Sequence, residues 1–303
     1  MHPAHTIGHL SYFQALVLGL LQGVSELFPI SSLGHTVLFP ALFGWHDLVK
    51  AQLATHGSFF LAFVVALHVG TALALLVYFR SEWARIIGAF FRTLAKRRIE
   101  TADERLAWLL GIATIPAGLM GLLFEHLFRV LFATPIAAAL FLMVNGLILL
   151  VGDRARLKAE HRSRARRSRS AVANHRQLAT LEFKEAGVIG TAQVLALLAG
   201  ISRSGITMVA GLLRGLDYED SARFSFLLAT PIILAAGVYK LPELFGPVGS
   251  SVQGQAVLGG LAAAVAAYLS TRFLMRYFEH NRLWPFAAYC LVFGAAMVIR
   301  FSL

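Results

Sequence analysis

The sequence predicts an all-α polytopic membrane protein built from inverted-topology repeats, with six transmembrane helices plus two re-entrant helical hairpins. Hydrophobic residues make up 57% of the 303 residues and charged residues only 14%, against about 25% in soluble domains. Six apolar stretches have the length of a membrane span, and two more are broken in the middle. The pattern at the first break recurs at the second with every position shifted by 171 residues, as from Gln22 to Gln193.

The first element is a broken apolar segment at residues 11–43. Pro29-Ile-Ser-Ser-Leu-Gly34 interrupts it, and each flanking piece is about half a span long. We therefore expect a re-entrant hairpin, whose irregular backbone must face protein or a wet cavity. Three spans follow and complete a first repeat over residues 1–151; they are expected at 59–79, 106–124 and 131–151.

The second half of the chain repeats this order. Residues 152–184 carry ten Lys/Arg and are expected to form a basic cytoplasmic loop. A second re-entrant hairpin at 186–213, broken by Ala199-Gly-Ile-Ser-Arg-Ser-Gly205, opens a second repeat over 185–303. Its three spans are expected at 222–240, 255–275 and 284–302.

The positive charge is concentrated in two stretches between apolar segments. Residues 80–105 carry seven Lys/Arg, so the positive-inside rule places both this stretch and 152–184 in the cytoplasm. Three spans per repeat is an odd number, so the first hairpin enters from outside, the second enters from inside, and their tips meet near the midplane. This distribution, with attraction to anionic lipid, accounts for the net charge of +11, and no nucleic-acid partner is expected.

Polar residues gather at the first break. Gln22 and Glu26 are four residues apart and share a helix face. An ionisable residue inside an apolar segment is costly and indicates function. We expect one of Ser31 and Ser32 to cap the helix that follows Pro29 and the other to be free to act.

His35 follows Ser32 by three residues, so a helix that starts here places both on one face. A histidine near a hydroxyl can serve as a general base or protonate a leaving group. His68 and Thr71, in the first span, could line the cavity, but we interpret them and Asn145 as packing or helix-bonding groups.

Arg203 is the main feature of the second break. Its planar guanidinium stays ionised and can hold two phosphate oxygens, and backbone N–H groups at a helix N-terminus also favour an anion. Two opposed helix N-termini and an arginine would stabilise the charge that develops on a transferring phosphoryl group. The residues expected to bind phosphate are Ser31, Ser202, Arg203, Ser204, Gly205 and Thr207.

These segments resemble a known family. Gln22-Gly-Val-Ser-Glu26-Leu-Phe-Pro-Ile-Ser-Ser-Leu-Gly-His35 is similar to the first signature of the undecaprenyl-diphosphate phosphatases of the bacitracin-resistance type. Ala199-Gly-Ile-Ser-Arg-Ser-Gly-Ile-Thr207 resembles their second signature. Phe224-Ser-Phe-Leu-Leu-Ala-Thr-Pro231 and Pro285-Phe-Ala-Ala-Tyr289 are similar to further family segments. The resemblance covers essentially the whole chain except the basic insert near 152–180.

The resemblance implies an enzyme that hydrolyses undecaprenyl diphosphate to undecaprenyl phosphate and inorganic phosphate, which recycles the lipid carrier of cell-wall synthesis. It places the family's nucleophilic serine at Ser32, its histidine at His35, its carboxylate at Glu26 and its arginine at Arg203. Ser32 would attack the terminal phosphorus or position the attacking water. The resemblance also implies a divalent cation, Mg²⁺ or Ca²⁺, which Glu26 and Gln22 would hold. Gln22 stands at an acidic position of the family; it can bind a cation but cannot act as a base. A bacterial plasma (inner) membrane location follows, with the active site open to the outer (periplasmic) face.

A transporter is the main alternative. Inverted repeats whose broken helices meet at the midplane are typical of alternating-access carriers, and such a flippase would move a phosphorylated polyprenyl lipid. The closeness of Ser32 and His35 in the sequence favours chemistry, because a carrier needs no proton shuttle. The acid-phosphatase type of lipid phosphatase requires a Lys/Arg-rich triple signature that we do not find. The expected partners are a polyprenyl diphosphate lipid and membrane lipids; a homodimer is left open.

Overall fold

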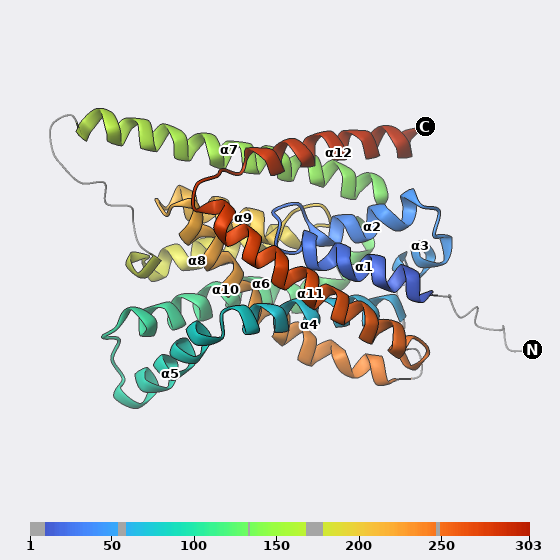
Figure 1. The fold of residues 1–303 in the computed structure, drawn as a ribbon, viewed down its shortest axis with the longest axis horizontal. Coiled ribbons are helices and arrows are strands. Elements are labelled where there is room, and N and C mark those ends of the chain that lie inside the picture. Colours follow the sequence, from blue (N-terminus) through green and yellow to red (C-terminus); the bar gives the residue numbers. More distant parts are fainter. Residues whose placement is uncertain (1–9, 54–58, 133, 168–177, 247–248) are drawn as a thin grey trace, which may run out of the picture.

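A computed structural model describes residues 10–53, 59–132, 134–167, 178–246 and 249–303, and every regular element in these ranges is a helix (Figure 1). Six helices are long and apolar enough to cross a membrane. They are α4 (Phe59–Tyr78), α6 (Ala102–Phe132), α7 (Pro135–Arg167), α10 (Tyr218–Lys240), α11 (Gln253–Phe278) and α12 (Trp284–Ser302). The predicted all-α polytopic fold class is confirmed.

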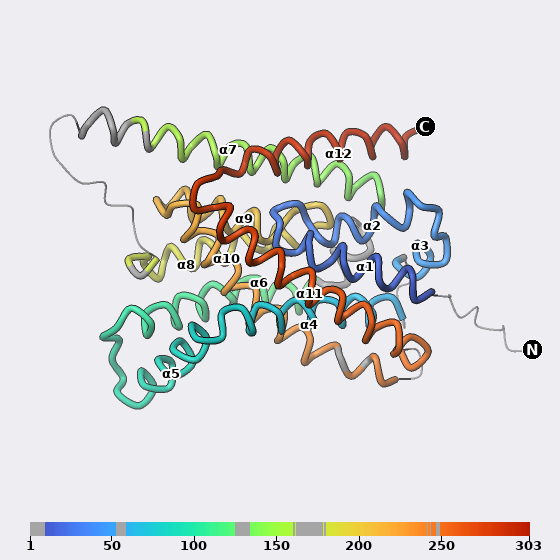
Figure 2. Tube along the Cα trace, in the orientation of Figure 1, coloured from blue at the N-terminus to red at the C-terminus, as the bar shows by residue number. Residues whose placement is uncertain are grey.

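Each broken segment forms a pair of short helices. The first pair is α1 (Tyr12–Ser25) and α2 (Ser32–Leu42); the second is α8 (Phe183–Ala192), continued by the 3₁₀ turn η2 (Gln193–Leu197), and α9 (Arg203–Leu213). α1 and α8 begin at opposite ends of the molecule, and both segments turn back near its middle (Figure 1; Figure 2). These short helices cannot cross a bilayer alone, so the segments are hairpins, as expected.

The second helix of each hairpin starts on the same serine cap. Ser31 Oγ accepts a hydrogen bond from Gly34 N at 3.2 Å, and Ser202 Oγ accepts one from Gly205 N at 3.1 Å. Such caps satisfy backbone donors that the first turn of a helix leaves unpaired. The expectation that one of the first two serines is a cap is confirmed, and Ser31 takes that role.

The two hairpin tips are in direct contact. Gly200 N donates to Ser31 Oγ at 3.1 Å, and Ser204 Oγ donates to Phe28 O at 3.3 Å. A Cβ atom on Gly34 would lie 2.9 Å from Gly200 Cα, so the approach requires glycine at position 34. The tips therefore meet inside the helix bundle, as the repeat pattern predicts.

Asn145, on α7, joins the tips from the side. Its Nδ2 donates to Pro29 O at 2.9 Å, and its Oδ1 accepts from Ser202 N at 3.0 Å. The interpretation of Asn145 as a packing or helix-bonding group is confirmed, and its amide satisfies backbone groups of both breaks. A break in a helix frees backbone groups that need such partners at membrane depth.

The packing of the hairpins repeats between the halves. α1 packs on α11 and its counterpart α8 packs on α6. Gly19 of α1 faces Gly259, and Gly190, which lies 171 positions after Gly19, faces Ala113. Small residues at these crossings let the backbones approach closely. This correspondence supports two repeats, although the division at 151 and 185 stays a prediction.

The connections collect at the two ends of the molecule. The short helix α3 (His46–Leu53) lies at one end, while α5 (Arg80–Lys96) and the end of α7 lie at the other (Figure 1). The two basic stretches therefore share an end, as the sidedness argument requires. Which end faces the cytoplasm stays a prediction.

The expected basic loop at 152–184 differs from the structure. α7 continues to Arg167, and 168–177 lies outside the described residues. Two anchors hold the start of this extension: Asp153 Oδ1 accepts from Tyr218 Oη at 2.8 Å, and Arg156 Nη1 donates to Gly215 O at 3.3 Å. Ala, Arg, Lys and Glu, which dominate this stretch, are strong helix formers, so the helix extends beyond the apolar span.

Candidate active site

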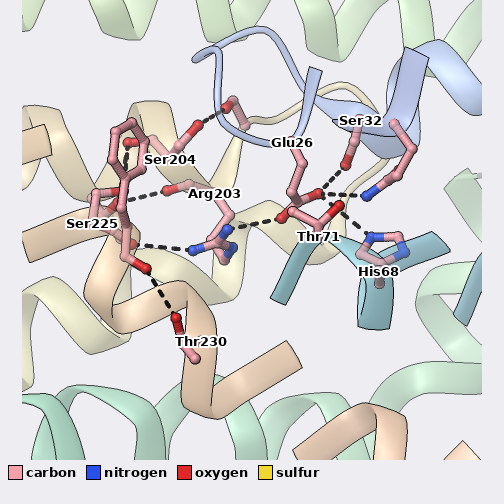
Figure 3. A network of polar contacts seen from close by, with 12 residues as sticks. Glu26, Ser32, His68, Thr71, Arg203, Ser204, Ser225 and Thr230 are labelled. Atoms are coloured by element: carbon pink, nitrogen blue, oxygen red, sulfur yellow. Dashed lines mark hydrogen bonds and ion pairs between the residues drawn. The ribbon is translucent and has the colours of Figure 1, made fainter. Parts of the chain in front are cut away.

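Glu26 lies at the centre of a buried polar cluster at the end of α1 and is 7% exposed. Its Oε1 accepts a hydrogen bond from Arg203 Nη2 at 2.8 Å. Its Oε2 accepts from Ser32 Oγ and, at 3.2 Å, from Gln22 Nε2. Figure 3 shows Ser32, His68 and Arg203 converging on this carboxylate from three helices. The carboxylate is thus the point where the two hairpins and α4 meet.

Arg203 is the first residue of α9 and 13% exposed on its side chain. Besides Glu26, its guanidinium donates from Nη1 to Ser225 O at 3.4 Å. Burying a charge is costly unless it is paired, and the contact with Glu26 supplies that pairing. The prediction that Ser32 and Arg203 lie close together is confirmed, since both contact the same carboxylate, while their catalytic roles stay predictions.

His68 completes the cluster from α4. Its Nδ1 donates to Val64 O at 2.9 Å, which turns Nε2 toward Glu26 Oε2 at 3.5 Å. The contact is an ion pair when the imidazole is protonated. At 22% its side chain is more exposed than that of Glu26 or Arg203. The interpretation of His68 as a packing group was therefore incomplete; the signal was a titratable residue inside an apolar span.

His35 is held apart from this cluster and fully buried. Its Nδ1 donates to Ser31 O at 2.7 Å, which leaves Nε2 to accept from Tyr289 Oη, also at 2.7 Å. Phe293 stacks on the ring at a centroid distance of 5.5 Å. The expected pairing of Ser32 with His35 differs from the structure, because both imidazole nitrogens are engaged elsewhere and Ser32 donates to Glu26. A proton-transfer role of His35 stays a prediction.

The remaining predicted phosphate ligands form hydrogen bonds around the start of α9, where Arg203 lies. Ser202 Oγ and Ser204 Oγ are 3.0 Å apart, and Thr207 Oγ1 lies 2.6 Å from Ser225 Oγ. Ser202, Ser204 and Thr207 are each at most 1% exposed. Gly205 is also buried, and its N–H is used by the Ser202 cap. Their predicted role in phosphate binding is untested; in this structure they hold the start of α9 in place.

The fit of a divalent cation rests on Glu26 and Gln22. Within the described residues no group of three or more His, Cys, Asp or Glu could hold a metal ion. The amide oxygen of Gln22 is buried without a partner, but so is that of its repeat counterpart Gln193. An orphaned oxygen at both positions is a feature of the repeat and does not by itself indicate a metal. Glu26 and Gln22 could offer two oxygens, so a cation would need further ligands from a substrate.

This arrangement suits an anionic substrate. The N-termini of α2 and α9 meet at the tips, and helix N-termini carry partial positive charge. A guanidinium, a histidine and a hydroxyl held on a carboxylate surround the same point. The fold thus defines a multi-pass membrane protein whose two re-entrant hairpins build one buried polar centre, and its guanidinium, hydroxyl and carboxylate are groups that phosphoryl transfer can use.

The comparison with known proteins specifies this class. The model of the family described as bacitracin resistance protein BacA matches residues 15–296, and the chain belongs to this family. Undecaprenyl-diphosphatase 2 of Frankia alni is 55% identical over 97% of this chain and 99% of its own length. The undecaprenyl-diphosphatase of Mycolicibacterium paratuberculosis is 52% identical with the same coverage. Undecaprenyl-diphosphatase 2 of Burkholderia orbicola is 48% identical over 94% of this chain and 95% of its own.

Proposed function

We propose that this protein is an undecaprenyl-diphosphatase, which hydrolyses undecaprenyl diphosphate to undecaprenyl phosphate and inorganic phosphate in a bacterial membrane. Relatives with that name match this chain over nearly their full lengths. The observation that carries the proposal is the contact of Ser32 and Arg203 with the two oxygens of Glu26. The Ser32 hydroxyl, the Glu26 carboxylate as a base and the Arg203 guanidinium as a phosphate-binding group meet there, at the junction of the repeats.

In this mechanism Ser32 Oγ attacks the terminal phosphorus. Its proton passes to Glu26 Oε2, the atom that it already contacts. The new bond joins Oγ to phosphorus, and the bond between phosphorus and the bridging oxygen breaks to release undecaprenyl phosphate. Water then cleaves the phosphoserine, which releases inorganic phosphate and restores the hydroxyl.

Arg203 stabilises the charge that develops during transfer. Its fork reaches Glu26 through Nη2, and a guanidinium can also bind phosphate oxygens with two parallel hydrogen bonds. The start of α9 and the start of α2 add partial positive charge at the same place. His68, as the most exposed of the groups that contact Glu26 through a nitrogen, is placed to hold this carboxylate in position and to exchange protons with solvent.

A divalent cation, Mg²⁺ or Ca²⁺, is part of the proposal. Glu26 and Gln22 are the residues that would hold it, together with diphosphate oxygens. When bound, it would neutralise phosphate charge. The carboxylate and the buried amide oxygen of Gln22 are what the protein offers for it.

The location follows from the charge distribution. In this proposal the cytoplasmic side of the molecule is the one where α5 and the C-terminal part of α7 lie, because this side carries the Lys/Arg-rich stretches. The active site opens to the periplasmic face, and the polyprenyl tail lies between helices toward lipid. A homodimer is compatible with this arrangement and is not required by it, since both hairpins of the site come from one chain.

The decisive experiment measures hydrolysis and lipid movement together. Purified protein in liposomes is given a C55 polyprenyl diphosphate, and phosphate release is followed beside transfer of the labelled lipid between leaflets. Phosphate release by the wild type and its loss in Ser32→Ala support the phosphatase. Transfer of intact diphosphate lipid without phosphate release would instead identify the alternating-access carrier.

A further inference from the structure

A cavity lies away from the helices that carry the candidate active site. This cavity, of about 570 Å³, opens between the end of α5 and the start of α6. It is lined by Thr93, Leu94, Arg97, Arg98, Ile99 and Trp108. None of these residues belongs to α1, α2, α4 or α9, which carry the catalytic cluster. The cavity therefore needs an explanation of its own.

The cavity offers two guanidinium groups to a ligand. Arg97 and Arg98 are exposed, and neither forms an ion pair within the part of the chain that the structure describes. Their neighbours differ: Arg92 lies 3.7 Å from Glu104, and Lys96 lies 3.5 Å from Glu100. The nearby carboxylates are thus taken by other cations. Two unneutralised arginines at one cavity favour an anion, and the guanidinium fork matches phosphate geometry.

The other walls of the cavity are apolar. Leu94 is 50% exposed and Ile99 is 42% exposed. Trp108 Nε1 donates to Thr93 Oγ1 at 3.0 Å, so the polar atom of the indole is satisfied and its ring surface lines the cavity. Phe91, at 63%, continues this apolar surface along α5. The ligand must therefore be anionic at one end and apolar beside it.

The position of the cavity along the chain places it at the membrane surface. α5 begins directly after the span α4, and the span α6 begins at Ala102, so Trp108 lies two turns into a membrane helix. Tryptophan is enriched at this depth, and Lys/Arg is enriched just outside it. α5 also lies at the end of the molecule that collects the basic stretches (Figure 1). A freely diffusing inorganic anion would gain no binding energy from the apolar walls of the cavity.

We propose that this cavity is a binding site for an anionic phospholipid, with the phosphate on Arg97 and Arg98 and the first part of an acyl chain on Leu94, Ile99 and Trp108. The cavity matches such a lipid in charge and in polarity. The two arginines lie where the phosphate of the headgroup would bind, and the apolar side chains lie beside them, where the acyl chain would follow. A zwitterionic lipid carries its own cation beside the phosphate and binds more weakly. The site would tie α5 to the cytoplasmic leaflet.

Trp108 provides the probe. The full-length protein in phosphatidylcholine nanodiscs is mixed with increasing fractions of brominated phosphatidylglycerol, which quenches nearby indoles, and Trp108→Phe isolates the signal of this residue among the four tryptophans. We expect quenching of Trp108 at low lipid fractions. In R97Q/R98Q the lipid fraction at half-maximal quenching should rise about 25-fold, since each arginine near an anionic surface contributes roughly fivefold.

The matched control removes two charges from the same end of the molecule. Arg272 and Arg276 are exposed on α11 and do not line the cavity, so R272Q/R276Q should move the midpoint by less than about twofold. Thermal unfolding of both double variants, compared with the wild type, verifies folding, and Arg98→Gln alone, with about a fivefold shift, serves if R97Q/R98Q folds poorly.

Three results would overturn the proposal. Equal shifts in the two double variants would mean general charge attraction without a site. Equal quenching by brominated phosphatidylcholine would mean that the cavity does not select an anionic lipid. Displacement of the quencher by millimolar inorganic phosphate would mean that the ligand is a free anion. Failure of hydrolysis in the wild type would leave this test unaffected, because it reads binding only.

Discussion

Arg203 Nη2 lies 2.8 Å from Glu26 Oε1, although the two residues are 177 positions apart in the chain. Glu26 ends the first helix of one hairpin and Arg203 starts the second helix of the other. The ion pair therefore exists only when both repeats are folded and their tips have met. Formation of the candidate active site is thus a consequence of assembling the two halves.

Arg203→Ala is expected to lower kcat/KM by about 10³-fold. The variant loses the phosphate-binding guanidinium and leaves the Glu26 carboxylate buried without its cation. Arg203→Lys keeps the charge but not the fork and should lose less, about tenfold to a hundredfold. Phosphate release from a polyprenyl diphosphate is the measurement, and exposed Arg272→Ala is the control. Normal turnover in Arg203→Ala would refute the site.

The neighbouring serines should separate activity from stability. Ser32→Ala removes the attacking hydroxyl and is expected to reduce kcat by about 10³-fold or more with little change in thermal stability. Ser31→Ala removes the α2 cap and the acceptor of Gly200 N, which costs about 1–2 kcal/mol of stability. Thermal unfolding and phosphate release measured on both variants test this. The reverse pattern would exchange the two assignments.

His68→Ala should reduce kcat by about tenfold to a hundredfold, because the contact of Nε2 with Glu26 is lost while Ser32 and Arg203 remain. His68→Gln restores much of the rate, since the amide N–H can donate to the same oxygen. Rates of the two variants at saturating substrate provide the measurement. Full activity of His68→Ala would show that the histidine only packs.

Tyr289→Phe tests the placement of His35. The hydroxyl that donates to His35 Nε2 disappears, while the ring that stacks on the imidazole stays. An unsatisfied buried nitrogen costs about 1–3 kcal/mol, so we expect a loss of activity of between about fivefold and 150-fold. His35→Ala should lose more, because it also frees Ser31 O. If His35→Ala is inactive and Tyr289→Phe is unchanged, His35 acts without this partner.

Removal of divalent cations tests the predicted cofactor. Treatment with a chelator should abolish phosphate release, and Mg²⁺ or Ca²⁺ should restore it. Gln22→Ala should raise the cation concentration needed for half-maximal rate by about tenfold, because one oxygen ligand is lost. Leu20→Ala, on the exposed surface of the same helix, is the control. Undiminished activity in the chelator would remove the cation from the mechanism.

Local pattern was enough to define most of the framework. Apolar runs placed the spans, and the last of them, 284–302, matches α12 residue for residue. The spacing of Gln22 and Glu26 placed them on one helix face, and they are hydrogen bonded at 3.2 Å. The shifted motif identified the tips and hence Ser32 and Arg203. These features depend on hydrophobicity, helical period and repetition, which are written along the chain.

The partner of each polar group was decided only by tertiary packing. Ser32 and His35 share a short helix, yet Ser32 donates to Glu26 and His35 pairs with Tyr289 on α12. His68 and Asn145 looked like ordinary polar residues of apolar helices until the crossing of α4 and α7 with the hairpins brought them to the breaks. Helical periodicity orders residues within one helix, but which faces of distant helices meet depends on how the whole bundle packs. The sequence by itself thus determined the helices, the repeat and the acidic and basic centres, and the assembled bundle determined the hydrogen bonds that connect them.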